Sequence, residues 1–310
     1  MVREVRNVLV TGATGFIGHA VVSKLSSCCN VIAPVREFKS HPVSGVSYIK
    51  IYDLLSIAAN VDLLKGKDVL IHVAGKAHTL QESLAEFKRI NTDATLELAR
   101  AAAASGIKRF IFLSSIVVNG VSNDKPFTSK DLPAPVEECA ISKLEAEIGL
   151  RVIAKDTGME VVIIRPPLVY GPDAPGNFGK LVNLALKNLP LPLGAIHNKR
   201  SLVALDNLVD LIVTCIGHPN AANQTFLVSD DDDISTTELL QMITRIAGKT
   251  SMLIPVPIPL LKAIGQIMGK KEIIDRLCGN LQVDIFHTKE TLKWKPPISV
   301  EEGIRRCFVF

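Results

Sequence analysis

The chain has 310 residues, a hydrophobic content of 47% and a formal net charge of +4. This length accommodates one large α/β domain with an appended lobe, and the core volume comes from aliphatic side chains because aromatic residues make up only 5%. The small positive excess forms no Lys/Arg block. We therefore expect neither nucleic acid nor a membrane as a partner.

The six cysteines form no C-x-x-C pair, which favours reduced thiols over a zinc site or a disulfide framework. The first apolar strand begins within ten residues of the start, and no signal-peptide pattern precedes it. The apolar stretch Leu253–Met268 is short and contains three prolines, so it is not expected to span a membrane. These features predict a cytoplasmic protein without a metal.

Short apolar runs alternate with helical patterns over the first half of the chain, which is typical of βαβ units. Helices are expected at Ile17–Ser26, Leu80–Ala104 and Val136–Ala154, and strands at Val8–Val10, Val31–Val35, Ser47–Ile51, Val69–Val73, Phe110–Leu113 and Val161–Ile164. The predicted fold class is α/β, a Rossmann-type doubly wound parallel sheet with a smaller C-terminal substrate-binding lobe.

The pattern changes after Tyr170, where a Gly/Pro-rich loop begins. Further elements are expected as a helix at Phe178–Lys187, a strand at Ser201–Ala204, a helix at Asn207–Ile216 and a strand at Phe226–Val228. We assign residues 1–170 and about 200–230 to the dinucleotide-binding domain, and residues 171–199 and 231–310 to the lobe. The acidic run Asp230–Asp233 is interpreted as a solvated loop, because Ser235 and Glu238 form a capping-box pattern just behind it.

A glycine triplet follows the first predicted strand directly. Gly12 allows a tight turn, Gly15 lets the backbone approach a diphosphate, and Gly18 lets the next helix pack closely. The helix N-terminus supplies free N–H groups, so Thr14, Phe16 and Ile17 join the glycines as expected cofactor contacts. In this strand–turn–helix context the G-x-x-G-x-x-G spacing predicts a nicotinamide dinucleotide site.

The end of the second strand bears on which dinucleotide is bound. NAD-binding proteins usually carry Asp or Glu there to bind the ribose hydroxyls, whereas this chain has Val35 followed by Arg36. A guanidinium accepts a 2′-phosphate through charge-assisted hydrogen bonds. We therefore expect NADP, with NAD as the alternative.

Several motifs in order resemble the extended short-chain dehydrogenase/reductases, in particular the NAD(P)-dependent nucleotide-sugar epimerase/dehydratase family. The likeness is greatest to bacterial UDP-sugar 4-epimerases and UDP-4-keto-6-deoxy-N-acetylglucosamine 4-reductases of surface-polysaccharide (O-antigen, lipopolysaccharide) assembly. The motifs are TGATGFIG (Thr11–Gly18), HVAGKAH (His72–His78), FLSS (Phe112–Ser115), RPPLVYGP (Arg165–Pro172), RSLVALDNLVDLI (Arg200–Ile212) and LKWKPPISVEEGI (Leu292–Ile304).

The resemblance implies hydride transfer between a sugar carbon and the nicotinamide, with a UDP-sugar as substrate. It implies that Ser115 bonds the sugar oxygen, that Lys143 holds the nicotinamide ribose, and that Asn91 orders water near this lysine. Asp53 and Leu54 are expected at the adenine, and Val73, Ala74 and Pro167 beside the cofactor. Arg200 and Arg276 are candidates for the substrate diphosphate. Asn177 is expected either to touch the sugar nucleotide or to be a helix N-cap without a ligand.

The chain departs from the resembled family at the acid/base. The position four residues before Lys143 holds Cys139 where the family has Tyr, and none of the three tyrosines has the required spacing. A thiol titrates near 8.5 but is shorter than a phenol, so reach rather than charge limits it. A bridging water could relay the proton in a slow enzyme, the substitution could disable the enzyme, or the chain could bind ligands without turnover.

Three functions stay open from the sequence alone: an NADP-dependent 4-keto reductase, a UDP-hexose 4-epimerase with permanently bound NAD, and a binding protein that has lost its acid/base. Ile116 and Val117 follow Ser115 where the family's dehydratases carry Asp-Glu, so dehydration is not expected. Loop roles rather than metal ligation are expected for His72 and His78. The resemblance also implies a homodimer formed through the two long helices.

Overall fold

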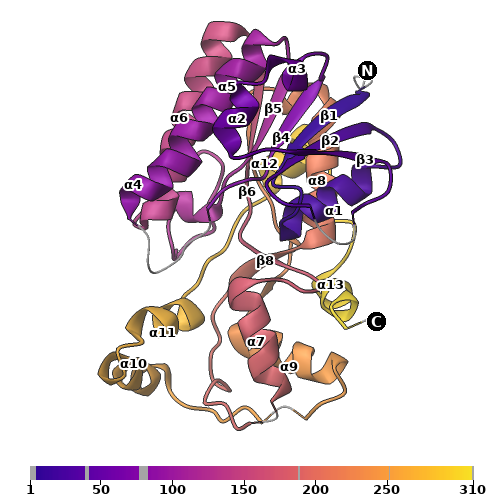
Figure 1. The fold of residues 1–310 in the computed structure, drawn as a ribbon. Coiled ribbons are helices and arrows are strands. Elements are labelled where there is room, and N and C mark those ends of the chain that lie inside the picture. The colour runs from indigo at the N-terminus through magenta and orange to yellow at the C-terminus, as the bar shows by residue number, and fades with distance from the viewer. Residues whose placement is uncertain (1–4, 39–41, 77–82, 188, 251, 309–310) are drawn as a thin grey trace.

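The computed structural model describes residues 5–38, 42–76, 83–187, 189–250 and 252–308. Figure 1 shows an upper body built on a large sheet and a lower body of helices and short strands, with the chain passing between them several times. The expected His78 lies outside the described residues.

The large sheet has seven strands in the order β3-β2-β1-β4-β5-β6-β9, and every neighbouring pair is parallel. The strand order reverses direction between β1 and β4, where doubly wound sheets bind their ligands. The strands are β1 (Asn7–Thr11), β2 (Asn30–Val35), β3 (Val46–Lys50), β4 (Val69–His72), β5 (Arg109–Leu113), β6 (Glu160–Arg165) and β9 (Thr225–Leu227). The predicted Rossmann-type fold is confirmed.

Helices cover both faces of this sheet because successive strand residues point to opposite sides. Val8 and Val10 face one apolar core, while Leu9 between them faces the other. The first core is closed by α1 (Phe16–Leu25), α8 (Leu205–Gly217), η3 (Pro219–Ala221) and α12 (Phe286–Leu292). The second is closed by α2 (Leu54–Ala58), α3 (Val61–Leu64), α5 (Ala94–Ala104) and α6 (Glu138–Thr157).

The helix expected at Leu80–Ala104 is interrupted. The described part consists of α4 (Leu84–Phe87), a π-helical turn η1 (Lys88–Asp93) and α5. The buried side chains of Asn91 and Thr92 lie in this turn, and the Thr92 hydroxyl donates to the Ser142 carbonyl of α6 at 2.8 Å. Apolar periodicity does not predict such a turn, because it carries no information on polar contacts with another helix.

The lower body contains a three-stranded sheet and a third apolar core. The strands are β7 (Leu168–Tyr170), β8 (Arg200–Ala204) and β10 (Asp233–Ile234), in the order β10-β8-β7. The helices are α7 (Gly176–Leu186), α9 (Thr236–Ile246), α10 (Ile258–Ile267), α11 (Lys271–Cys278) and α13 (Val300–Arg306). Strand β8 therefore pairs in the small sheet, although it begins the 200–230 segment that we assigned to the dinucleotide domain.

The interpretation of Asp230–Asp233 as a solvated loop is wrong for its first residue. Asp230 is buried, and its carboxylate accepts hydrogen bonds from the Tyr170 hydroxyl at 2.7 Å and from the Asn207 amide at 2.7 Å. Burial raises the pKa of Asp230 above its usual range. The capping box at Ser235 and Glu238 is confirmed.

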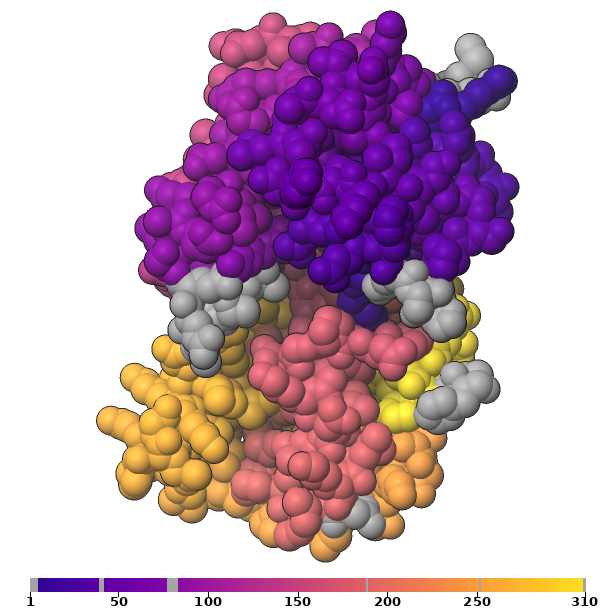
Figure 2. Space-filling model, viewed as in Figure 1, coloured from indigo at the N-terminus to yellow at the C-terminus, as the bar shows by residue number. Residues whose placement is uncertain are grey.

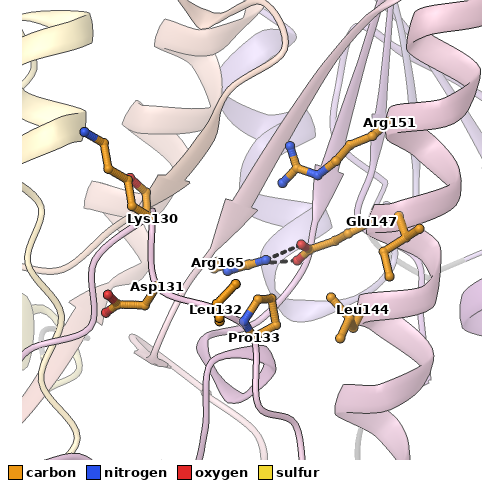
Figure 3. A pocket seen from close by; sticks show the side chains of 10 residues that line it. Lys130, Asp131, Leu132, Pro133, Leu144, Glu147, Arg151 and Arg165 are labelled. Carbon is orange, nitrogen blue, oxygen red and sulfur yellow. Dashed lines mark hydrogen bonds and ion pairs between the residues drawn. The ribbon is translucent and has the colours of Figure 1, made fainter.

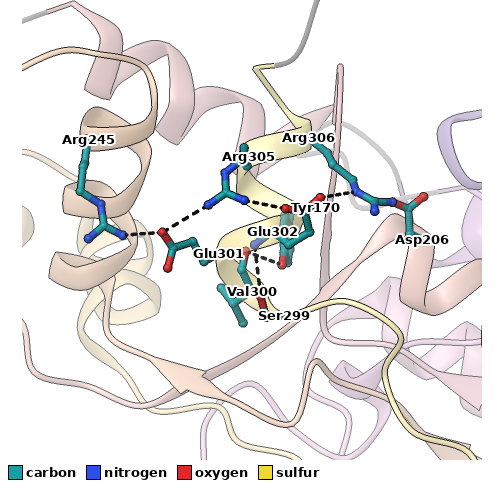
Figure 4. A network of polar contacts seen from close by, with 9 residues as sticks. All are labelled: Tyr170, Asp206, Arg245, Ser299, Val300, Glu301, Glu302, Arg305 and Arg306. Carbon is teal, nitrogen blue, oxygen red and sulfur yellow. Dashed lines mark hydrogen bonds and ion pairs between the residues drawn. The ribbon is translucent and has the colours of Figure 1, made fainter.

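Helix α13 connects both bodies, as Figure 4 shows. The Arg306 guanidinium pairs with Asp206 of α8 at 2.7 Å, and Arg245 of α9 pairs with Glu301 at 3.2 Å. These exposed pairs contribute little individually. The buried Tyr170 hydroxyl lies 3.2 Å from the Val300 carbonyl, so the end of the chain is fixed near the small sheet.

Candidate functional site

The turn between β1 and α1 lies at the carboxyl edge of the large sheet. Gly12 has φ +74°, and a Cβ there would lie 2.7 Å from the backbone nitrogen of Ala74. A Cβ on Gly18 would lie 2.1 Å from the Gly12 carbonyl oxygen. The turn is therefore pressed between the loop after β4 and the first turn of α1, and only glycine fits at both positions.

Helix α1 begins with free backbone donors. Its N-cap residue is the exposed Gly15, no side chain caps it, and its first turn carries no acidic residue. Thr14, Phe16 and Ile17 surround this end and are partly buried. An uncapped helix N-terminus attracts an anion through its N–H groups and dipole, so these residues fit the diphosphate of a dinucleotide.

His72 and Thr11 fix the neighbouring ends of β4 and β1. The His72 ring lies 2.7 Å from the Thr11 hydroxyl and 2.9 Å from the Thr95 hydroxyl. Complete burial lowers the pKa of His72 to about 3, so the ring is neutral. The expected loop position of His72 is wrong, because His72 is the last residue of β4, and Val73 and Ala74 follow it directly beside Gly12.

The expected adenine end lies at β2 and α2. Val35 is buried as the last residue of β2, and Arg36 is exposed immediately after it. Asp53 is the N-cap of α2, where its carboxylate accepts from the Ser56 amide at 2.9 Å. Leu54 follows as the first helical residue. The Asp53 side chain therefore has a structural role in addition to any contact with a ligand.

Lys143 reaches the expected nicotinamide end of this edge from α6. Its ammonium donates to the Leu113 carbonyl at 2.9 Å and lies 5.3 Å from the centre of the Phe112 ring. A Cβ on Gly75 would be 3.6 Å from this nitrogen. Burial lowers the pKa of Lys143, while the charge of Glu147 opposes that effect.

Ser115 follows β5 and is half-buried at the start of η2 (Ile116–Val118). Its hydroxyl lies 3.5 Å from the Val117 amide, a long and weak contact that leaves the oxygen able to bond a ligand. Pro167 is buried just after β6, and the Ile116 amide donates to the neighbouring Pro166 carbonyl at 2.9 Å. Ser115 and Pro167 therefore follow adjacent strands at the same edge.

Cys139 lies in the first turn of α6, one turn before Lys143. Its thiol is buried and donates to the Lys76 carbonyl at 3.4 Å. Burial raises the pKa of the Cys139 thiol, although the charge of Lys143 acts in the opposite direction. The thiol is therefore neutral at physiological pH.

Asn91 joins three segments of the site. Its side-chain oxygen accepts from the Lys76 amide at 2.8 Å, and its side-chain nitrogen donates to the Ser142 hydroxyl at 3.1 Å. The same nitrogen also lies 3.2 Å from the Lys76 carbonyl. Asn91 thus anchors the loop after β4 to α6, a role that its expected water-ordering function did not include.

A buried polar network that sequence reasoning missed lies one turn beyond Lys143. Glu147 forms an ion pair with Arg165 and accepts from the Ser114 hydroxyl at 2.5 Å. The second carboxyl contact of Arg165 is 2.9 Å long, and both charged side chains are almost fully buried. Lys143, Glu147 and Arg151 recur every four residues, and this helical spacing is the signal that would have located the network.

A cavity of about 360 Å³ borders this network (Figure 3). Leu132, Pro133 and Leu144 form its apolar wall, and the guanidinium of Arg151 lies on the opposite side. Neither Ser115 nor Cys139 lines it. This cavity is therefore separate from Ser115, Cys139 and the glycine turn.

The expected substrate residues of the lower body have varied surroundings. Asn177 is exposed in the first turn of α7, whose N-cap is Pro175, so the alternative of Asn177 as N-cap is wrong. The Arg200 guanidinium donates to the Arg276 carbonyl at 2.6 Å. The Arg276 guanidinium pairs with Glu137 at 2.5 Å, which links α11 to the residue two positions before Cys139.

Two further findings concern metals and membranes. In the described ranges, no three or more His, Cys, Asp or Glu side chains gather as metal ligands would. No helix there combines the length and apolar character needed to cross a membrane. All six cysteines fall within these ranges, and each is a free thiol.

The seven-stranded sheet, the glycine turn at its carboxyl edge and a half-buried lysine at the same edge define an extended short-chain dehydrogenase/reductase. Residues 8–229 match the NAD dependent epimerase/dehydratase family. The chain is 46% identical to a UDP-glucose 4-epimerase of Vibrio cholerae, over 97% of this chain and 94% of the relative. The chain therefore belongs to the NAD-dependent epimerase/dehydratase family.

Solved structures have the same fold. A UDP-glucuronic acid 4-epimerase of Bacillus cereus in complex with NAD superposes with a TM-score of 0.79 at 21% identity, covering 97% of this chain and 96% of that one. A UDP-glucose 4-epimerase of Thermotoga maritima with UDP-glucose gives a TM-score of 0.78 at 23% identity, covering 97% of both chains. At these identities the likeness concerns the fold alone.

Proposed function

We propose that the chain is an NAD-dependent 4-epimerase that acts on a UDP-sugar. The observation that carries the proposal is the position of Lys143, whose half-buried ammonium donates to the Leu113 carbonyl near Gly75 at the carboxyl edge of the sheet. The relative from Vibrio cholerae, named for this reaction, supports it because the match extends over nearly the whole of both chains.

Each candidate residue has a separate task in this proposal. NAD, when bound, supplies the hydride acceptor for the sugar C4 and returns the hydride to it. The backbone of Gly12, Gly15 and Gly18 with Thr14, Phe16 and Ile17 holds the diphosphate. Lys143 holds the nicotinamide ribose, and its positive charge favours loss of a proton from the sugar hydroxyl. Ser115 hydrogen-bonds the same sugar oxygen.

The proton route is the unusual part of the proposed mechanism. The Cys139 thiol is directed to the Lys76 carbonyl, its pKa is raised, and it is shorter than the phenol that the family places here. Direct proton transfer needs heavy atoms within about 2.6–3.2 Å of each other. We propose that a water between Ser115 and Cys139 passes the proton of the sugar hydroxyl to solvent and returns a proton to the same oxygen when the hydride comes back, which leaves a slow enzyme.

Replacing Cys139 with Tyr tests this proposal. The Cys139→Tyr variant should raise kcat for interconversion of UDP-glucose and UDP-galactose by about 10²–10⁴-fold, because it restores a direct acid/base. Conversion is measured by chromatography of the nucleotide-sugars, with UDP-N-acetylglucosamine as a second substrate. Cys139→Ser, which has no such reach, serves as the matched control and should gain nothing.

The same measurement separates the epimerase from a binding protein. If Cys139→Tyr binds NAD and a UDP-sugar but converts neither substrate, the epimerase proposal fails and the non-catalytic alternative is preferred. If neither wild type nor variant binds NAD(H) or NADP(H), the assignments of Gly12, Gly15 and Gly18 fail as well.

A second candidate function, an NADP-dependent 4-keto reductase, is favoured by one observation. Val35 ends β2 without a carboxylate, and the exposed Arg36 follows it at a position suited to a 2′-phosphate. The nucleotide that acid releases from the purified protein discriminates between the two functions by mass spectrometry. Bound NAD supports the epimerase, whereas NADP supports the reductase.

Several further assignments belong to the proposal. Asp53, Leu54, Val73, Ala74 and Pro167 line the cofactor, and Asn91 positions the loop beside it. Asn177, Arg200 and Arg276 bind the sugar nucleotide from the lower body. We further propose a homodimer acting in the cytoplasm in surface-polysaccharide (O-antigen) assembly. The proposed domain division is residues 1–170 and about 200–230 against the rest, except that β7 and β8 belong to the small sheet and α12 packs on the large sheet.

A further inference from the structure

The α10–α11 hairpin presents apolar side chains to solvent along one side of α10. Leu260, Ile264, Ile267 and Met268 are all exposed, and their spacing of four, three and one residues places them in one stripe. A helix on the surface of a globular protein normally shows the reverse pattern, with polar residues outward. This stripe is therefore not explained by packing within the chain.

The opposite side of the same helix anchors the hairpin. Leu261 is buried in the lower core, and a Cβ on Gly265 would lie 2.6 Å from a side-chain carbon of Ile274, so the two helices cross closely. The Lys270 amide donates to the Gly265 carbonyl at 2.7 Å, and Gly269 has φ +64°, which closes α10 in a Schellman motif. The stripe thus belongs to a well-formed hairpin.

Positive charge adjoins the stripe at the turn of the hairpin. Lys270 and Lys271 follow Met268 after one glycine, both are exposed, and neither forms an ion pair among the described residues. Ile273 continues the exposed apolar surface on α11. Figure 1 shows the hairpin at the left margin of the lower body, and Figure 2 shows it projecting there.

We propose that the hairpin tip, formed by Ile267, Met268, Lys270 and Lys271 with Leu260 and Ile264 behind it, docks on an anionic membrane surface. Apolar side chains on one face of a helix with lysines beside them bind the headgroup region of a bilayer, where the chains are inserted and the cations meet lipid phosphates. The pairing of apolar and basic residues at a projecting tip favours a lipid surface through charge complementarity.

The size of the patch argues against a stable protein partner. A standard protein–protein interface involves about 20–30 residues on each side, whereas the tip and stripe offer only a few. Docking leaves the chain outside the bilayer core, in keeping with the lack of a membrane-crossing helix in the described ranges. The sequence led us to expect no membrane partner. The proposal changes this expectation to binding at the membrane surface without crossing the bilayer.

Flotation of the full chain with lipid vesicles tests the proposal. Wild-type protein should float with phosphatidylcholine vesicles that contain about one-third phosphatidylglycerol and should be released by high salt, because screening weakens the lysine contribution. It should not float with pure phosphatidylcholine. The double variant Lys270→Gln/Lys271→Gln should lower the vesicle partition coefficient about 25-fold, because each lysine contributes about fivefold.

The apolar contribution is tested with two matched variants. Met268 and Val61 are both 60% exposed, but Val61 lies on α3 in the upper body. Met268→Glu should lower vesicle binding at least about tenfold, while Val61→Glu should bind as wild type does. Both substitutions are on the surface, so folding is checked by circular dichroism and is expected to be unchanged.

Three results would overturn the proposal. The first is wild-type protein that stays in the soluble fraction at every lipid concentration. The second is equal vesicle binding by Met268→Glu and Val61→Glu. The third is conversion of a dimer to monomer by Met268→Glu in sedimentation, which would make a second copy of the chain the occupant of this face.

Discussion

The buried His72 makes the free energy of unfolding of the chain depend on pH. Its ring lies between the hydroxyls of Thr11 and Thr95, and burial lowers its pKa to about 3. In the unfolded chain the pKa is about 6.5. Below that value the unfolded state binds a proton that the folded state refuses, so the free energy of unfolding falls as the pH falls from about 6.5 toward 3.

The His72→Gln variant should remove this dependence. One such group gives a slope of up to about 1.4 kcal/mol per pH unit within the window. Urea unfolding at several pH values between neutrality and mild acid should give a shallower slope for His72→Gln than for wild type, even if the variant is less stable at neutral pH. Parallel slopes for the two proteins would contradict the assignment of a buried neutral His72.

Gly12, after strand β1, and Gly66, between α3 and β4, show two different reasons for glycine in the turns that connect strands and helices. Both have positive φ, +74° and +72°, but a Cβ on Gly66 would meet nothing within 4 Å, whereas one on Gly12 would collide with Ala74. The left-handed conformation costs a non-glycine residue about 1–2 kcal/mol at either position. Only Gly12 adds the steric collision.

The Gly12→Ala variant should therefore lose more than the Gly66→Ala control. We expect about 1–3 kcal/mol of additional destabilisation and at least about tenfold weaker NAD binding, because the amides after Gly12 would be displaced. Urea unfolding and a titration with NADH measure the two effects. Similar losses in both variants would mean that the turn is not pressed against the loop after β4.

Local patterns were sufficient for most elements of the sheet. The six strands expected in the first half all form, within one residue at each end for most of them, because apolar runs bounded by glycine and polar residues carry that information. The π-helical turn at Lys88–Asp93 was not predictable from local patterns, because its residues Asn91 and Thr92 bond segments far away in the sequence.

The site shows the same division. The glycine turn was predicted from its place after the first strand, and Ser115 and Lys143 were candidates through the family resemblance; the fold brings Ser115 and Lys143 to the carboxyl edge of the sheet. The contact of Cys139 with Lys76 and the pair of Glu147 with Arg165 were not found, since each joins residues far apart in the chain. Arg200 and Arg276 were candidates because a guanidinium can bind a diphosphate with two hydrogen bonds, and their partners Gly279 and Glu137 became known only from the fold.

At the scale of the whole molecule, helices α5 and α6 form one outer wall. A Cβ on Gly149 would lie 2.6 Å from a methyl carbon of Leu96, so the two helices pack closely. On the outer side of α6, Ile148 and Val152 lie one turn apart and are 55% and 53% exposed. Ile148 also lines the cavity beside Leu132 and Leu144. This surface suits the proposed homodimer, because pairing would remove it from water.

Ile148→Glu/Val152→Glu should convert such a dimer to monomers. Burying an aliphatic side chain stabilises by about 1.5–3 kcal/mol. In a dimer with twofold symmetry each side chain occurs twice in the interface, so replacing it with a charged one removes this contribution twice. Analytical ultracentrifugation measures the change in mass. Ile273→Glu is a matched control, because Ile273 is 56% exposed but lies on α11. A monomeric wild type, or a double variant that stays dimeric, would place the interface elsewhere or exclude it.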